Sequence, residues 1–191
     1  MGIKELLLQN RSYRRFAQEP KLSHEDLCDL INAVRLSGSA RNDQVLRFVL
    51  IESKEACDKL FPNTAWAGYL KDWPGPDKNE QPTSYILILT PKEPSQFVLM
   101  DVGIASQSIL LSAVEKGFGG CMLGSIKRKA IRELFNIDEQ YEISLAIALG
   151  KSSETVIVED IVEDNTHYYR DENDVHHVPK KTVDELILDI K

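Results

Sequence analysis

Apolar side chains recur at helical spacing in several stretches of the chain, most clearly after Ser23. Four of them fall at i, i+3, i+4 and i+7, the spacing of a helix face turned toward a core. They are Leu27, Leu30, Ile31 and Val34. Ser23 and Asp26 stand at the N-cap and N3 positions of a capping box, which predicts a helix ending near Ser37. Similar patterns predict helices over residues 2–9, 54–61, 96–116, 126–135 and 183–190.

The longest of these helices, residues 96–116, has small or apolar residues almost all round. Such a helix has little polar face to give to solvent, so we expect it to be central and buried. Gly117, Gly119 and Gly120 follow it and are typical of a left-handed helix end. The helix after Ser125 carries basic residues on the face that we expect to be exposed.

Short, continuous apolar runs predict the strands. They cover residues 47–51, 85–90 and 143–149, with a brief extended piece at 121–123. Continuous apolar character is typical of strands that are buried on both faces. Helices come first and strands then alternate with helices, so the pattern predicts an α/β or α+β fold with a mixed sheet covered by helices.

Two segments stand apart from this regular pattern. Residues 62–82 hold four prolines, two glycines, Trp66, Tyr69 and Trp73, a composition that breaks regular structure and predicts a lid-like excursion. Residues 163–191 form a polar C-terminal extension, in which we expect a hairpin over residues 168–177 and the closing helix. We expect residues 1–191 to form one domain with this tail attached.

Composition narrows the class of protein. With 42% apolar and 28% charged residues, the chain is unlike collagen, disordered proteins and membrane-spanning proteins. The longest purely apolar run, residues 85–89, is far shorter than the roughly 20 residues that cross a bilayer. No secretory signal is visible at the amino terminus, so we expect a cytoplasmic protein without a membrane partner. The net charge of −7 argues against nucleic acid binding.

The three cysteines and four histidines give no sign of a metal site. Cys28, Cys57 and Cys121 are widely spaced and include no CxxC pair, so we expect reduced and mostly buried thiols. The histidines show no metal-ligand spacing with cysteines or carboxylates. We therefore predict no bound metal.

Basic residues gather near both ends of this acidic chain. The clusters are Arg11, Arg14 and Arg15 near the amino end and Lys180 and Lys181 near the carboxyl end. Guanidinium forks and the hydroxyl of Ser12 are donors that suit a phosphate group. Taken alone, the arginine run is more typical of a solvated basic turn, and the lysine pair of an ordinary surface.

Two further runs have both a binding and a purely structural interpretation. Residues 39–44 offer amide and hydroxyl donors to the polar edge of a heterocycle, but their residue types are also those of a common turn. Gly119, Gly120 and Gly124 flank residues 122–123 and would let the main chain approach a flat ligand. They also serve as helix stop signals.

In their order and spacing these runs resemble the nitroreductase family, a family of FMN-dependent oxidoreductases, over residues 6–186. The matching pieces are residues 11–16, 39–44 with 47–48, 101–105, 117–121, 148–150 and 179–181. The resemblance implies an α+β, three-layer sandwich with a mixed, mostly antiparallel sheet and a long central helix. It also implies an intertwined homodimer with FMN at the subunit interface.

The resemblance assigns cofactor contacts to twelve residues of this chain. They are Arg11, Ser12, Tyr13, Arg14, Ser39, Asn42, Gln44, Met122, Leu123, Gly124, Lys180 and Lys181. The residues at the two ends of the chain would hold the phosphate and ribityl chain. Those of residues 39–44 would reach the flavin of the other subunit, and those of residues 122–124 would lie against the ring and offer an N–H to its N5.

The implied function is that of an NAD(P)H-dependent FMN oxidoreductase. Hydride would pass from NAD(P)H to flavin N5, and a small planar acceptor such as a nitroaromatic or quinone would then take electrons at the same site. No catalytic side chain is implied, because the cofactor carries the chemistry. Trp66 and Tyr69 are candidates for an aromatic wall around the acceptor, with core packing as the alternative.

The chain departs from the family pattern at Asn10, where many members have a basic residue. This departure shifts the expected phosphate contact toward Lys180 and Lys181. Three other functions remain open at this stage. One is a flavin- or nucleotide-binding module without turnover, and another is a different reductive flavin chemistry on the same fold. The third is a structural protein of this fold that has lost FMN.

Overall fold

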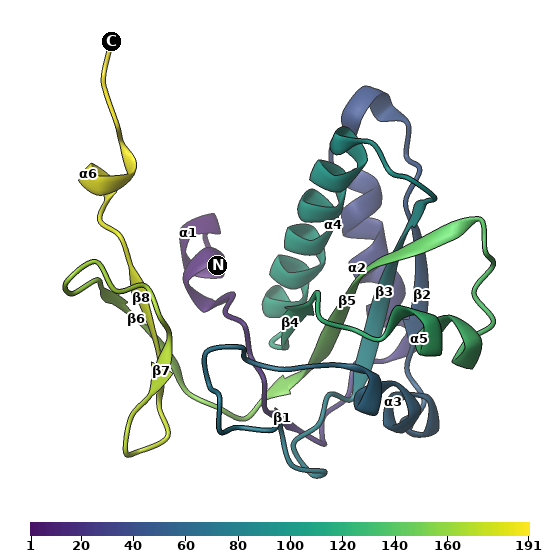
Figure 1. The fold of residues 1–191 in the computed structure, drawn as a ribbon, viewed down its shortest axis with the longest axis horizontal. Helices are drawn as coiled ribbons and strands as arrows, with labels where there is room; N and C mark the ends of the chain where they lie inside the picture. The colour runs from purple at the N-terminus through teal and green to yellow at the C-terminus, as the bar shows by residue number, and fades with distance from the viewer.

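The computed structural model describes residues 1–191, which fold around a five-stranded antiparallel sheet (Figure 1). Its strands are β1 (Phe16–Ala17), β2 (Arg47–Ile51), β3 (Ser84–Pro91), β4 (Gly119–Leu123) and β5 (Tyr141–Ser152). The central strand is β5, which pairs with β3 along one edge and with β4 and then β1 along the other. Strand β2 pairs with the outer edge of β3.

Both faces of this sheet are buried. In β3, Tyr85 and Leu87 belong to one apolar cluster, whereas Ile86 and Ile88 belong to a second cluster on the opposite face. Successive side chains of a strand point to opposite faces, so two buried faces require an unbroken apolar run. This explains why the strand patterns of the sequence are continuous rather than alternating.

Helices cover the two faces and give three layers. Helices α2 (His24–Leu36) and α4 (Gln96–Glu115) pack on one face, and α3 (Lys54–Leu60) and α5 (Arg128–Leu134) lie at the other (Figure 1). The predicted α+β class with a mostly antiparallel sheet and one long helix is confirmed. The predicted capping box is also confirmed, since the Ser23 hydroxyl accepts from the Asp26 N–H at 3.1 Å.

A second, three-stranded sheet stands beside the sandwich. It contains β6 (Val156–Asp160), β8 (His176–Lys180) and β7 (Tyr169–Arg170) in that order. Figure 1 shows it at one side of the molecule, with α1 (Ile3–Gln9) between it and α4. The expected hairpin is confirmed by the antiparallel pairing of β7 and β8. Strand β6 was not predicted, because each of its residues pairs with a residue of β8 twenty positions later in the chain.

Two predicted helix boundaries are wrong. The last helix, α6 (Val183–Leu186), has a single turn instead of reaching residue 190. Leu188 and Ile190 are fully or almost fully exposed, so no packing extends this helix. Helix α5 begins at Arg128, and Ser125 does not cap it. Residues 125–127 instead run along residues 63–65, where Lys127 donates its N–H to Asn63 at 2.8 Å.

Helix α4 is buried on one side only, which corrects the expectation of a fully buried helix. Eight of its residues are buried, including Val102, Ile109 and Ala113, whereas Phe97, Met100 and Ile104 are about half exposed. It is also the one helix that is long and apolar enough to cross a membrane. Its packing on the sheet accounts for that composition, as in the core helix of many globular proteins.

Candidate functional site

The arginine-rich turn at residues 10–15 lies against strand β4. Helix α1 ends at Gln9, with Asn10 as its C-cap, and the Tyr13 N–H then donates to the Gly120 carbonyl at 3.0 Å. The Tyr13 ring covers Gly119, where a Cβ atom would stand 2.4 Å from the ring carbon Cδ2. Only glycine permits this approach, so the glycines after α4 hold the turn on the sheet as well as ending the helix.

Glu154 ties the same turn to the second sheet. Its carboxylate, on a side chain only 2% exposed, accepts hydrogen bonds from the main-chain N–H groups of Arg14 and Arg15. It also accepts from Nη2 of Arg170 in β7 at 2.8 Å. This buried carboxylate therefore fixes the amino-terminal turn next to the carboxyl-terminal hairpin.

A cavity of about 290 Å³ opens where these segments meet. We call it the basic cavity. Its walls come from the turn, α4, β4 and the second sheet. The lining residues are Asn10, Arg11, Ser12, Arg14, Gln107, Leu110, Met122, Tyr168, His176, Val178 and Lys180. They include three cations and no carboxylate, which makes the cavity a suitable environment for an anion.

The arginines of this cavity have unused donors. Nε of Arg11 and Nε of Arg14 are buried and have no hydrogen-bond partner. Burial also lowers the pKa of the Arg11 guanidinium below its ordinary value. Buried polar groups are nearly always hydrogen-bonded in folded proteins. Two orphaned guanidinium donors in one cavity therefore fit a ligand with several negatively charged oxygens, such as a phosphate ester.

The two lysines of the carboxyl-terminal cluster have different surroundings. Lys180 lines the basic cavity, whereas Lys181 is exposed and makes an ion pair with Asp164 at 2.7 Å. Lys180 is the last residue of β8, and Lys181 follows the strand. The structure thus brings Arg11, Ser12, Arg14 and Lys180 together and leaves Lys181 outside.

A second cavity of about 240 Å³ continues from the first, and we call it the Trp66 cavity. The two share Arg14, Met122 and Tyr168 in their walls. The remaining lining residues are Ala65, Trp66, Ala67, Gly68, Cys121, Leu123, Gly124 and Ser125. A long ligand with an anionic end and a flat apolar end fits this arrangement, because the basic part and the apolar part adjoin.

Tyr69 does not line either cavity. Its ring stacks on His167 with centroids 4.2 Å apart, and its N–H donates to the Tyr168 hydroxyl at 3.3 Å. The aromatic residues of segment 62–82 thus divide between two tasks. Trp66 faces the cavity, while Tyr69 holds the segment to the carboxyl-terminal extension.

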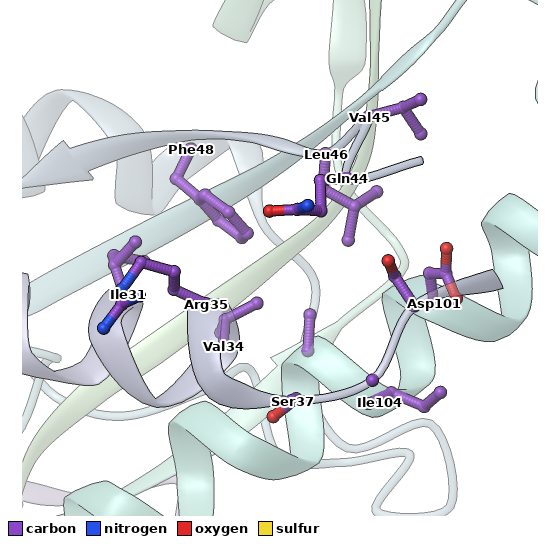
Figure 2. A pocket seen from close by; sticks show the side chains of 13 residues that line it. Ile31, Val34, Arg35, Ser37, Gln44, Val45, Leu46, Phe48, Asp101 and Ile104 are labelled. Carbon is purple, nitrogen blue, oxygen red and sulfur yellow. The ribbon is translucent and has the colours of Figure 1, made fainter. Parts of the chain in front are cut away.

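The loop at residues 39–44 lies elsewhere, over a separate pocket of about 160 Å³. Figure 2 shows this pocket between α2, α4 and the start of β2, with Gln44, Leu46 and Phe48 on one side and Asp101 and Ile104 on the other. Ser39 lines the pocket with a buried, unpartnered hydroxyl, whereas Asn42 is exposed.

This loop is held in a strained conformation. Arg41, Asn42 and Gln44 all have positive φ angles, between 47° and 58°. The Ala40 N–H donates to the buried carboxylate of Asp101 at 2.9 Å. Residues in this region of φ/ψ space cost free energy and persist where the surroundings fix them, often at functional sites. The pocket at this loop and the basic cavity have no lining residue in common, although both border α4.

Sequence reasoning missed His176, Tyr168 and Val178 as cavity residues. The two in β8 could have been found from Lys180, because alternate residues of a strand share a face. His176 is 1% exposed, and its pKa is lowered to about 4, chiefly by burial and then by the nearby cations of Arg14 and Arg170. It is therefore a neutral side chain at neutral pH.

Comparisons with known proteins agree on one family. Residues 7–151 match the model of the nitroreductase family. YdgI of Bacillus subtilis strain 168, named by inference as an NAD(P)H nitroreductase, is 23% identical over 184 residues, which cover 78% of this chain and 88% of YdgI.

Two solved structures have the same fold. An FMN-dependent nitroreductase from Clostridium difficile R20291 superposes with a TM-score of 0.64 at 22% identity, over 85% of this chain and 92% of its own. A protein of Exiguobacterium sibiricum 255-15, assigned as a nitroreductase and solved in complex with FMN, gives a TM-score of 0.66 at 18% identity. The match covers 81% of this chain and 90% of that protein.

Proposed function

Because this chain belongs to the nitroreductase family, we propose that it is an FMN-dependent oxidoreductase. In this proposal it takes hydride from NAD(P)H and delivers it to a small planar acceptor such as a nitroaromatic or quinone. The FMN dependence of the C. difficile enzyme and the FMN complex of the E. sibiricum protein support this assignment. Bound FMN supplies reversible hydride acceptance at a planar ring.

The observation that carries the proposal is the pair of orphaned guanidinium donors in the basic cavity. Nε of Arg11 and Nε of Arg14 have no partner in the protein, and Lys180 adds a third cation to the same walls. A phosphate ester would satisfy these donors through charge-assisted hydrogen bonds. Without such a ligand, buried donors of this kind are costly, since each lost hydrogen bond costs about 1–3 kcal/mol.

The other residues of the site bind the flat end of the ligand and orient the reactants. In the proposal the flat end of the ligand enters the Trp66 cavity, where Met122, Leu123 and Gly124 supply main chain and Trp66 supplies an apolar wall. The aromatic wall and main chain would also align a visiting nicotinamide or acceptor and exclude water. No side chain of these cavities is proposed as nucleophile or general base.

We further propose that the active form is a homodimer. Helix α4 exposes Phe97, Met100 and Ile104, and the tail after β8 exposes Leu186 and Leu188. Apolar surface on this scale, on two separate elements, favours a protein interface. A second subunit would also explain the loop at residues 39–44, which contributes no lining residue to the basic cavity of its own chain.

The visible absorbance spectrum tests the function directly. The purified protein, with FMN added if needed, is expected to retain the yellow flavin through gel filtration. Anaerobic NADH or NADPH should then bleach the colour, and a nitroaromatic or quinone should restore it. A protein that retains no FMN contradicts the flavin assignment. Flavin that stays oxidised with both nucleotides contradicts the enzyme and favours a binding module without turnover.

Alanine variants locate the phosphate contact in the same experiment. Arg11→Ala and Arg14→Ala should each weaken FMN retention by about tenfold or more, because each removes a charge-assisted hydrogen bond. Lys129→Ala is the control, since this exposed lysine on α5 lies outside both cavities. Arg128 is unsuitable as a control because it donates to the Ile143 carbonyl at 2.8 Å. Equal retention in all three variants would refute the phosphate assignment.

A further inference from the structure

Arg14 belongs to a cluster of side chains in the wall of the basic cavity, together with His176 and Tyr168. Arg14 is 7% exposed and His176 is 1% exposed, although the two are 162 residues apart in the chain. Nη1 of Arg14 lies 3.2 Å from Nε2 of His176, and the guanidinium carbon lies 4.7 Å from the centroid of the Tyr168 ring. The guanidinium is therefore enclosed on several sides by the carboxyl-terminal extension.

The hydrogen-bond donors of this guanidinium divide into two groups. Nη1 has two hydrogens, and its two acceptors are the Ser12 carbonyl at 3.1 Å and Nε2 of His176. Nε is buried without a partner, and Nη2 has no hydrogen bond within the chain. Nε and Nη2 form one edge of the planar group, and two parallel N–H bonds from such an edge match a phosphate or carboxylate.

The protonation of His176 follows from its contacts. Arginine is always a donor, so Nε2 of His176 must be the acceptor and the ring proton must be on Nδ1. A protonated imidazole would have no lone pair for Arg14 and would place a second cation beside it. The charged groups around the ring are Arg14 from the turn, Arg170 from β7, and His177 and Asp174 from the hairpin. Three of these four are basic, so the surroundings favour the neutral ring.

We propose that His176 is a positioning residue: its neutral imidazole holds Nη1 of Arg14 and thereby turns the free Nε–Nη2 edge toward the phosphate of the cofactor. This inference rests on the proposed FMN function for the identity of the anion, but the Arg14–His176 contact does not depend on it. It assigns to the carboxyl-terminal hairpin a second contribution to the site, in addition to Lys180.

The neighbouring residue provides a matched comparison. His177 is on the opposite side of β8, where Nδ1 lies 2.8 Å from Glu159 and Nε2 lies 3.4 Å from Asp171. These carboxylates raise the pKa of His177, whereas burial and nearby cations lower that of His176, so the two adjacent histidines are shifted in opposite directions. His177 lines neither cavity. A substitution there disturbs the same strand without touching Arg14.

Flavin binding tests the proposal with two variants and two ligands. In His176→Leu the acceptor is lost, and we expect the dissociation constant for FMN to rise about tenfold or more. In His176→Gln the amide oxygen can replace Nε2 as acceptor, so most of the affinity should return. Riboflavin has no phosphate, and its affinity should be equal in all three proteins. A loss of FMN and riboflavin binding in equal measure would mean that His176 is merely structural.

Two controls sharpen the result. His177→Leu should leave the ratio of FMN to riboflavin affinity unchanged. In an Arg14→Ala background, His176→Leu should have no further effect on FMN, because the residue through which it acts is gone. Additive losses in the double variant would overturn the proposal.

Nitrogen NMR of the ligand-free protein separates this inference from the proposed function. With ¹⁵N-labelled histidine, and with His176→Gln to assign the signal, we expect Nδ1 protonated and Nε2 bare at neutral pH, and we expect Arg14→Ala to shift the Nε2 signal. A protonated Nε2, or an Nε2 signal that does not shift in Arg14→Ala, overturns the inference whatever the flavin-binding result. If wild-type protein binds no FMN but shows these NMR shifts, only the proposed function fails.

Discussion

At the scale of single residues, the charge state of His176 makes the stability of the fold depend on pH. The folded protein lowers the pKa of this side chain from 6.5 to about 4, chiefly through burial and also through Arg14 and Arg170. The unfolded chain therefore takes up a proton at a higher pH than the folded one. Stability is fully present above about pH 6.5 and falls as the pH drops toward 4.

The pH dependence of unfolding tests this expectation. The pKa difference corresponds to about 3 kcal/mol lost between pH 6.5 and pH 4. Urea unfolding of the wild type and of His176→Gln, measured every half pH unit, should show a steeper decline in the wild type. Carboxylates titrate alike in both proteins, so the difference between the curves isolates His176. Parallel curves would show that the histidine does not titrate as its surroundings indicate.

Residue types alone could not identify the members of the site. Arg11, Arg14 and Lys180 line one cavity, but no local pattern connects positions so far apart in the chain. The order of several weak motifs pointed to that grouping through the family resemblance. The alternation of β8 could have placed His176 beside Lys180, but its contact with Arg14, 162 residues away, leaves no local signal in the sequence.

At the scale of elements, segment 62–82 and the carboxyl-terminal hairpin are joined by an aromatic contact. The Trp73 ring lies 4.4 Å from the guanidinium carbon of Arg170 and 5.7 Å from that of Arg15. Arg170 and Arg15 are themselves bound to Glu154 and Asp174. Trp73 therefore packs against cations that are already fixed, which limits the entropy lost in forming the contact.

Hydrogen exchange should reveal this coupling. Trp73→Ala removes cation–π contacts worth about 0.5–2 kcal/mol, so amide exchange should accelerate about twofold to thirtyfold where the two elements meet. We expect the acceleration at residues 66–73 and also at 168–177. Trp73→Phe keeps an aromatic face and should show a smaller change. Acceleration confined to residues 66–73 would mean that the hairpin does not depend on this contact.

Elements with a strong local pattern were predictable, even where their partners are distant, as β3 and β5 show, whereas short elements defined by a distant partner were not. The helix of residues 24–36 shows its stripe and its capping box within a short stretch, and both appear in the structure. Strand β1 has two residues, and its pairing with Lys151 and Ser152 defines it. Helix α6 stops after one turn because the apolar residues after it have nothing to pack on.

At the scale of the whole molecule, one chain leaves apolar surface that a single subunit does not cover. The side chain of Leu188 is fully exposed, and Leu186 is 70% exposed. The exposed side of α4 is the other such surface. The proposed dimer predicts that the tail is buried only when two chains associate.

Sedimentation of a tail variant tests that prediction. The wild type is expected to sediment at twice its mass of 21.6 kDa. Leu188→Asp should weaken the dimer about tenfold or more, because it removes the burial of one leucine per chain, worth about 1.5–3 kcal/mol. Asp189→Ala, at the adjacent position, should not. A monomeric wild type would contradict the dimer. If Leu188→Asp dimerises as tightly as the wild type, the tail does not lie in the interface.

The contact between Arg14 and His176 can form only late in the synthesis of the chain. At a synthesis rate of roughly 5–20 residues per second, His176 is added about 8–30 s after Arg14. Until then the Ser12 carbonyl is the one acceptor that Nη1 of Arg14 has, however well the sandwich has folded. In the proposed function, cofactor binding therefore comes late in the synthesis of the chain, and a prematurely terminated product would carry the arginine turn without a finished site.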